Sequence, residues 1–153
     1  MENEELFFLL DNLKNWCAYQ ERCQQDVLEK IKSYKRRLSD DEINGLIAQL
    51  IAENFINEER YAIAFASGKF RIKRWGRIKI STMLKVKRIS DYSINRALDS
   101  IENNDYERVV NELLEKKKRE LKSETNKIRL NYKLLKFLQS RGFETDIVVS
   151  MIK

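Results

Sequence analysis

A short pattern occurs twice in the chain, and this repeat constrains the fold more than any other feature. Arg37-Leu38-Ser39-Asp40 returns 51 residues later as Arg88-Ile89-Ser90-Asp91. In each copy a basic residue ends one helix, and a serine can then accept the free N–H groups of the next helix as its N-cap. Ser39 with Glu42 also fits a capping box. The repeat therefore predicts that a new helix begins at each serine.

The apolar residues after each serine keep the same spacing. They follow an i, i+3, i+4, i+7 stripe, which indicates a helix with one buried face. A third copy lies 54 residues after the second, where Gly142 supplies a helix stop. The first two stripes are Ile43, Leu46, Ile47, Leu50 and Ile94, Ala97, Leu98, Ile101. The third copy matches Leu138, Arg141, Phe143, Val148, Met151 and Ile152 to Leu84, Lys87, Ile89, Ile94, Ala97 and Leu98.

These anchors predict an all-α protein of three tandem three-helix repeats that form an elongated, curved array. The absence of proline and the presence of only four glycines favour helices throughout. We place Asn44-Gly45, normally a turn signal, inside the third helix. The expected repeats are 1–56, 57–103 and 104–153. The expected helices are 4–20, 24–35, 39–55, 57–74, 77–87, 90–102, 105–122, 126–141 and 144–152.

The charge of the chain is strongly polarised. From Arg60 to Ser90 there are ten Lys or Arg residues and no Asp or Glu, whereas the rest of the chain has 20 basic and 24 acidic residues. Such a segment creates a local positive field that attracts phosphates or an acidic protein surface. The alternative is a solvated helix face. Because the segment contains no acids, we expect its cations, Arg71, Lys73 and Arg77 among them, to lack ion pairs within the protein.

Aromatic and apolar residues alternate with the cations of this segment, and we expect them to anchor it in the core. Gly76 leaves two possibilities open, an accessible helix N-terminus that could hold a phosphate or carboxylate, and a tight turn between helices. Trp75 could stack on a nucleic-acid base, but a tryptophan at a helix end more often packs against the protein.

Catalytic and metal-binding patterns are missing from the sequence. There is no histidine, the commonest general base, and the glycines are too dispersed for a phosphate-binding loop. Cys17 and Cys23 lack the further ligands of a metal site. The acidic clusters 40–42 and 58–59 fall in first turns of expected helices, where carboxylates favour the helix dipole. We therefore expect no catalytic residue, no metal and no cofactor.

The location and the oligomeric state follow from hydropathy and from the expected amphipathic helices. No apolar stretch approaches the roughly 18 residues of a membrane span, and the acidic N-terminus is unlike a signal peptide. We expect a cytoplasmic protein with no membrane partner. We also expect a monomer, because the helices leave no obvious exposed apolar face.

Two stretches of the middle repeat resemble the central signature of the RecX family of bacterial regulatory proteins. They are Asn57-Glu58-Glu59-Arg60-Tyr61-Ala62-Ile63-Ala64-Phe65 and Trp75-Gly76-Arg77-Ile78-Lys79-Ile80. The likeness extends to Arg22, Asp26, Val27, Lys30 and Ile31 in the first repeat and to 138–143 in the third. It covers nearly the whole chain.

The resemblance implies a protein of three three-helix repeats that lodges in the groove of the RecA nucleoprotein filament. It implies inhibition of the ATPase, strand exchange and co-protease activities of RecA, and so a role in recombination, DNA repair and the SOS response without catalysis. Arg60 matches an arginine of the signature, for which an ion pair with a neighbouring repeat is the competing role. The residues expected to face the filament or its DNA are Arg60, Lys69, Arg71, Lys73, Arg74, Arg77, Lys79, Lys85, Lys87 and Arg88.

Three departures from the family pattern have structural consequences. Arg88 stands where the second repeat usually has a glycine, which puts the helix-ending turn in doubt. Met83 replaces a frequent acid, and Lys35-Arg36-Arg37 lengthens one connection by about two residues.

Other functions compete with this interpretation. A helix-turn-helix DNA-binding regulator would use 77–87 or 90–101 as its recognition helix, but the latter carries only Arg96 as a cation. A helical scaffold would explain the repeats but not the one-sided charge. The cations also predict modest affinity for single-stranded DNA without sequence preference.

Overall fold

The computed structural model describes residues 2–152, and all regular secondary structure in that range is helical. This confirms the all-α class. The helices are α1 (Glu2–Tyr19), α2 (Gln24–Lys32), α3 (Asp40–Ala52), α4 (Glu58–Arg71), α5 (Arg77–Val86), α6 (Asp91–Asp99), α7 (Asn103–Glu120), α8 (Lys127–Ser140) and α9 (Thr145–Met151).

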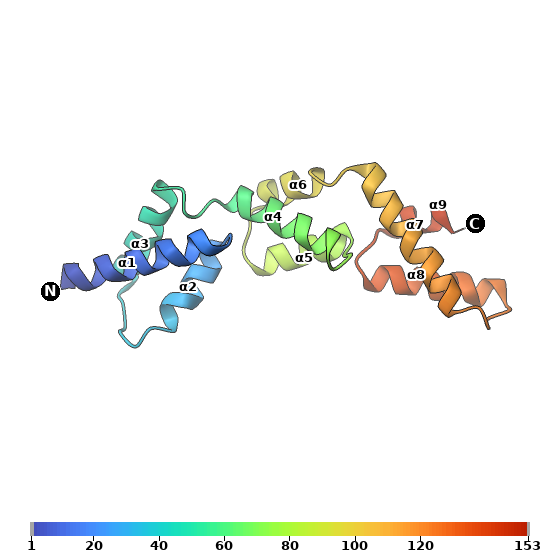
Figure 1. The fold of residues 1–153 in the computed structure, drawn as a ribbon, viewed down its shortest axis with the longest axis horizontal. Coiled ribbons are helices and arrows are strands. Elements are labelled where there is room, and N and C mark those ends of the chain that lie inside the picture. Colours follow the sequence, from blue (N-terminus) through green and yellow to red (C-terminus); the bar gives the residue numbers. More distant parts are fainter. Residues whose placement is uncertain (1, 153) are drawn as a thin grey trace.

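The helices form three groups of three in an extended row (Figure 1). The group α1–α3 lies at one end, α4–α6 in the middle and α7–α9 at the other end, so the two ends of the chain are far apart (Figure 1). The tandem arrangement predicted from the repeat is confirmed. Within residues 2–152, no helix is both long enough and apolar enough to cross a membrane.

Polar side chains cap the helices where the sequence predicts that they begin. The Ser39 hydroxyl accepts the Glu42 N–H at 3.2 Å, and the Glu42 carboxylate accepts the Ser39 N–H at 3.0 Å, so the capping box is present. Ser90 caps α6 in the same way by accepting the Ser93 N–H. The Asn44-Gly45 pair lies inside α3, because the apolar stripe outweighs the turn preference of those two residues.

The connection after α4 differs from the prediction. The helix ends at Arg71, three residues before the expected position 74. Arg74 adopts a left-handed conformation with a φ of 56°, and the Trp75 N–H donates to the Lys69 carbonyl at 3.1 Å. The chain therefore reverses within a few residues and directs α5 back along α4.

The turn between α5 and α6 has the same backbone shape as the turn between α8 and α9. Gly142 has a φ of 89° after α8, and Arg88 has a φ of 61° at the matching position after α5. The Ile89 N–H donates to the Leu84 carbonyl at 3.1 Å, as the Phe143 N–H does to Leu138. The turn that Arg88 put in doubt is thus formed without a glycine.

Arg88→Gly is expected to stabilise the fold by about 0.5–1 kcal/mol, because a left-handed residue with a Cβ costs about 1–2 kcal/mol and glycine recovers this at a smaller entropic cost. Urea denaturation followed by circular dichroism measures the difference. The control is Lys85→Gly in the last turn of α5, which should lose about 1 kcal/mol. An equal loss in both variants would contradict the assignment of strain to Arg88.

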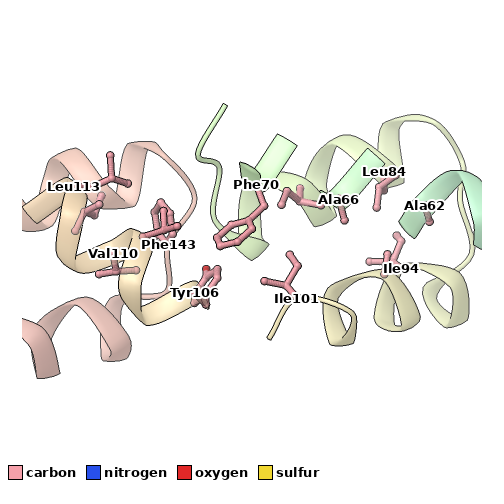
Figure 2. Packing of buried hydrophobic residues seen from close by; sticks show 14 of the residues in the cluster. Ala62, Ala66, Phe70, Leu84, Ile94, Ile101, Tyr106, Val110, Leu113 and Phe143 are labelled. Atoms are coloured by element: carbon pink, nitrogen blue, oxygen red, sulfur yellow. The ribbon is translucent and has the colours of Figure 1, made fainter. Parts of the chain in front are cut away.

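Two hydrophobic cores hold the row together. The smaller one lies within the first group and contains Leu13, Val27, Ile31 and Leu50. The larger one runs from α4 to α9, so the second and third groups share a continuous core (Figure 2). At its centre, the ring of Tyr106 contacts Phe70 and Phe143, with centroid separations of 5.7 and 5.3 Å.

Two glycines allow the backbones of the second and third groups to touch. The Gly76 N–H donates to the Arg141 carbonyl at 2.8 Å, and the Ile78 N–H donates to the Gly142 carbonyl at 2.9 Å. The Arg77 N–H donates to the hydroxyl of Tyr106 at 2.9 Å. The N–H groups at the start of α5 therefore already have hydrogen-bond acceptors within the protein. Gly76 therefore serves the close approach of two backbones, and its accessible-anion alternative is wrong.

Several large apolar side chains are exposed at both ends of the row. Phe7 and Phe8 of α1 are each 69% exposed, and Ile128 and Tyr132 of α8 are 82% and 60% exposed. The expectation that no apolar face is exposed, from which we predicted a monomer, is therefore wrong.

Candidate functional site

The basic segment lies in the middle of the row, on α4, α5 and the turns that follow them (Figure 1). Both helices end in cations, which suits the negative end of the helix dipole. The tertiary structure divides the ten candidate residues into two kinds, cations paired with acids from neighbouring groups of helices and cations without such partners.

Two of the paired cations hold the first group against the second. The Arg60 guanidinium donates to both carboxylate oxygens of Glu21, at 2.9 and 2.5 Å. The Lys87 ammonium bonds the Asp26 carboxylate at 2.7 Å. Arg60 therefore has an ion pair with a neighbouring repeat, the role that competes with contact to a filament.

Two further paired cations hold the second group against the third. Arg74 bonds Glu112 at 2.8 Å, and Arg77 bonds Glu144 at 3.0 Å. The Arg77 guanidinium also lies 3.8 Å from the ring centre of Tyr106, whose hydroxyl donates to Glu144. The expectation that these cations lack internal partners is wrong for Arg77, because the acids come from parts of the chain outside the basic segment.

The Asp26–Lys87 pair makes stability depend on pH. Burial alone would raise the pKa of Asp26, but bonds from the Lys87 ammonium and the Cys23 N–H outweigh it, and the pKa falls below its ordinary 3.8. The bond to Asp26 in turn raises the pKa of Lys87. A carboxyl group with a lowered pKa stabilises the fold above its ordinary pKa, and this contribution disappears as pH falls through the folded-state value.

Asp26→Asn is accordingly expected to lose about 1–2 kcal/mol of unfolding free energy at pH 7. The difference from the wild type should begin to shrink as pH falls to the ordinary pKa of 3.8, and it should disappear as pH falls through the lower folded-state pKa of Asp26. Chemical denaturation between pH 7 and pH 2 measures both effects. Asp11→Asn is the control, since Asp11 is exposed. A difference that is independent of pH would contradict the role of the charge.

Six of the candidate cations have no carboxylate of residues 2–152 within 4.0 Å. Four of these side chains are exposed, and those of Lys69 and Lys79 lie over the ring of half-buried Trp75, 5.0 and 4.6 Å from its centre. Trp75 thus contacts two ammonium groups and packs against Phe65. The six are Lys69, Arg71, Lys73, Lys79, Lys85 and Arg88.

Exposed apolar side chains lie between these cations. Ile72 is 79% exposed, Ile78 53% and Val86 66%. The expectation that the apolar members anchor the segment is wrong for these three, although Phe70, Ile80 and Leu84 are buried. A contiguous apolar patch with a polar rim typically marks a surface that contacts another macromolecule, and these three side chains are the candidates for such a patch on the middle group.

A groove that the sequence did not reveal lies beside this surface, between the first and second groups. It has a volume of about 660 Å³. Trp16 and Phe65 supply its apolar walls, and Arg22, stacked 4.0 Å from the ring centre of Trp16, lies at its edge. Its residues come from α1, α2 and α4, from the connection between α1 and α2, and from Lys87 after α5, so no local sequence pattern could have found the groove.

Potential metal ligands and the two thiols can be compared with the sequence expectations. No three His, Cys, Asp or Glu side chains within 2–152 are grouped to bind a metal ion. Burial raises the pKa of Cys23 to about 11 and also raises that of Cys17. Both thiols therefore remain protonated at neutral pH, and a thiol is a weaker nucleophile and ligand than a thiolate.

Known proteins with similar sequences and structures share one family. The model of the second three-helix domain of RecX matches residues 57–98. The chain is 30% identical to the regulatory protein RecX of Clostridium perfringens, with 86% of the chain and 68% of that protein covered. It is 32% identical to that of Clostridium tetani, covering 86% and 66%. The crystal structure of RecX from Lactobacillus salivarius has a TM-score of 0.87 and 23% identity, over 98% of this chain and 96% of that one.

These matches extend over most of the chain, and the part matched by the family model contains the basic segment from Arg60 to Arg88. The three groups of three helices agree with the same assignment. The chain therefore belongs to the RecX family of regulatory proteins.

Proposed function

We propose that this protein binds the nucleoprotein filament of the RecA recombinase in the cytoplasm and lowers its ATPase, strand-exchange and co-protease activities. It acts by occupying a surface, without a catalytic step, and as a single copy in dilute solution. The fold supports this role because an extended row of helices suits a long, polymeric partner (Figure 1).

The observation that carries the proposal is the mixture of unpaired cations and exposed apolar side chains on the middle group. Arg71, Lys73 and Lys85 offer charge that no internal carboxylate of residues 2–152 neutralises. Ile72 and Val86 offer apolar area, which a protein partner buries and a DNA backbone does not. This composition favours a protein–DNA filament over bare DNA as the partner.

We further propose that residues 1–56, 57–103 and 104–153 act as three modules, of which the second presents this surface. The ion pairs of Arg60, Arg74, Arg77 and Lys87 would keep the outer modules in position beside it. The unpaired cations would also give weak affinity for single-stranded DNA without sequence preference.

A helix-turn-helix regulator that reads DNA with α6, one of its two possible recognition helices, is less well supported. In α6 the one cation is Arg96, and it is paired with Glu59 at 2.9 Å. A recognition helix presents its side chains to base edges in the major groove. The described α6 offers no unpaired cation for that purpose.

The test is to titrate the protein into a RecA ATPase reaction at saturating single-stranded DNA. We expect the rate to fall with saturation, and the protein to co-sediment with RecA filaments more strongly than with the same DNA alone. The excess of DNA separates binding to the filament from competition for DNA. An unchanged rate at saturating protein would refute the inhibitory role, and equal co-sedimentation with bare DNA would favour a DNA-binding regulator.

A further inference from the structure

The two ends of the row carry surfaces of opposite character. At the first end, α1 presents Glu4, Phe7, Phe8 and Asp11, all of them exposed. Their spacing of three, four and seven residues places them on neighbouring positions of one helix face. We call these four residues the head face. The opposite side of α1, with Leu6, Leu10 and Leu13, packs on the first core.

The other end carries an apolar pocket on α8 and α9. Tyr132, Leu135 and the polar Asn131 of α8 line it together with Val149 and Ile152, and its volume is about 220 Å³. An apolar cavity of about 150 Å³ is large enough to bind benzene. The pocket can therefore hold one phenyl ring.

Cations lie on the α8 side of this pocket, whereas the α9 side carries the exposed Asp146. Residues 125–143 contain five Lys or Arg residues and no Asp or Glu. Lys127 and Lys136 are exposed, and the Lys136 ammonium lies 5.5 Å from the ring centre of Tyr132. Lys133 has a distant carboxylate contact with Glu124 at 3.7 Å. We call the pocket with Ile128, Tyr132, Lys127 and Lys136 the tail face.

From these two surfaces we propose that one copy of the chain binds a second copy head to tail, with the head face seated on the tail face. The tail face fits a helix that offers an exposed aromatic ring flanked by carboxylates. The head face is such a helix, with Phe7 or Phe8 to fill the pocket and Glu4 and Asp11 to approach the cations. The fit is one of shape and of charge sign.

The contact must join two molecules, because α1 and α8–α9 lie at opposite ends of the row (Figure 1). A head-to-tail contact uses two different surfaces, so a dimer keeps a free head and a free tail and can add further copies, as an open array or a closed ring. The faces are small relative to a standard interface of about 800 Å² per partner, and contacts below that size are weak and transient. The association therefore requires high protein concentration.

Sedimentation velocity on the isolated chain, at concentrations up to about 1 mM, tests the contact without any other partner. The mean mass should rise with concentration beyond that of a dimer. Phe7→Ser with Phe8→Ser should abolish the rise, and so should Ile128→Ser with Tyr132→Ser. Tyr92→Ser, at a 67% exposed aromatic of α6, is the control and should associate like the wild type. Circular dichroism verifies that each variant is folded.

Mixing distinguishes head-to-tail binding from other contacts. The head variant retains a tail and the tail variant retains a head, so their mixture should form dimers and nothing larger. Glu4→Lys with Asp11→Lys, and Lys127→Glu with Lys136→Glu, should each weaken association at least tenfold, whereas a chain with all four changes should recover it. A wild-type chain that stays monomeric at 1 mM, a mixture that forms no dimer, or a control that loses association would each overturn the proposal.

Discussion

Replacing Gly142 by alanine is expected to destabilise the protein by about 3–5 kcal/mol. A Cβ at this position would lie 2.3 Å from the Cβ of Lys79 and 2.5 Å from its backbone nitrogen. The φ of 89° is also one that residues with a Cβ rarely adopt. The backbone of α5 would have to move away.

That movement would break the contact between the second and third groups. It would lengthen the bonds from the Gly76 and Ile78 N–H groups to the loop after α8, which are 2.8 and 2.9 Å long. It would also disturb the packing of Phe143 against Tyr106 in the shared core (Figure 2). Urea denaturation, followed by circular dichroism, is the measurement.

Gly68→Ala is the matched control. Gly68 lies inside α4, and an added Cβ there would have no neighbour within 4 Å. Alanine should therefore stabilise α4 by about 0.5–1 kcal/mol. Gly76→Ala should lose a similar unfolding free energy, because its Cβ would lie 2.4 Å from the Gly142 carbonyl. In the double variant the two losses should not add, since both changes disturb the same contact. A loss of unfolding free energy below about 1 kcal/mol in Gly142→Ala would show that the close approach of the two backbones does not require glycine at this position.

Replacing Arg71, Lys73 and Lys85 by Glu is expected to raise the protein concentration needed for half-inhibition of the RecA ATPase about tenfold to a hundredfold. The three changes alter the charge of this surface by six units. Like charges placed together at an interface can cost several kcal/mol, and each 1.4 kcal/mol is a factor of ten in affinity. The assay is the ATPase titration at saturating single-stranded DNA.

The variant should remain folded, because these three side chains are exposed and have no carboxylate of residues 2–152 within 4.0 Å. Exposed substitutions of this kind usually change stability by about 0.5 kcal/mol or less each. Arg77 is left out of the variant on purpose. Arg77 bonds Glu144 and Asn103, so Arg77→Glu would break the contact between the second and third groups. A loss of inhibition could then come from a change of structure instead of a change of the docking surface.

A matched control reverses Lys116, Arg119 and Lys122, which are exposed at the end of α7 and in the turn after it. This variant carries the same six-unit change in net charge on a different surface. It should inhibit RecA nearly as well as the wild type. Equal loss in both variants would mean that net charge alone matters, and equal inhibition by all three proteins would place the docking surface elsewhere.

Local sequence patterns predicted the helices because capping and amphipathicity act over a few residues. Ser39, Ser90 and the apolar stripe after each serine specify where α3 and α6 begin and which face is buried. Gly142 marked the end of α8 for the same reason, since a left-handed turn favours a residue without a Cβ. The predicted ends of α2, α3, α4 and α6 each lie three residues beyond the observed ones. After α4, Arg74 makes a left-handed turn without glycine, so no glycine marked that end.

The candidate site was only half predictable. The absence of acids from 60–90 correctly located a basic segment, and its match to the RecX family agrees with that location. The sequence could not separate the unpaired Arg71 from the paired Arg77. That distinction depends on Glu144, which lies 67 residues away along the chain.

The sequence by itself determined the helices, the tandem repeat and the position of the excess charge, because each depends on neighbours within a few turns of helix. The tertiary structure alone decided which cations form ion pairs within the protein and which apolar residues stay exposed. It also decided that two backbones approach closely at Gly76 and Gly142. Those features depend on how rigid helices pack against each other. Packing joins residues from separate groups of helices, and no short-range pattern in the sequence encodes their distances.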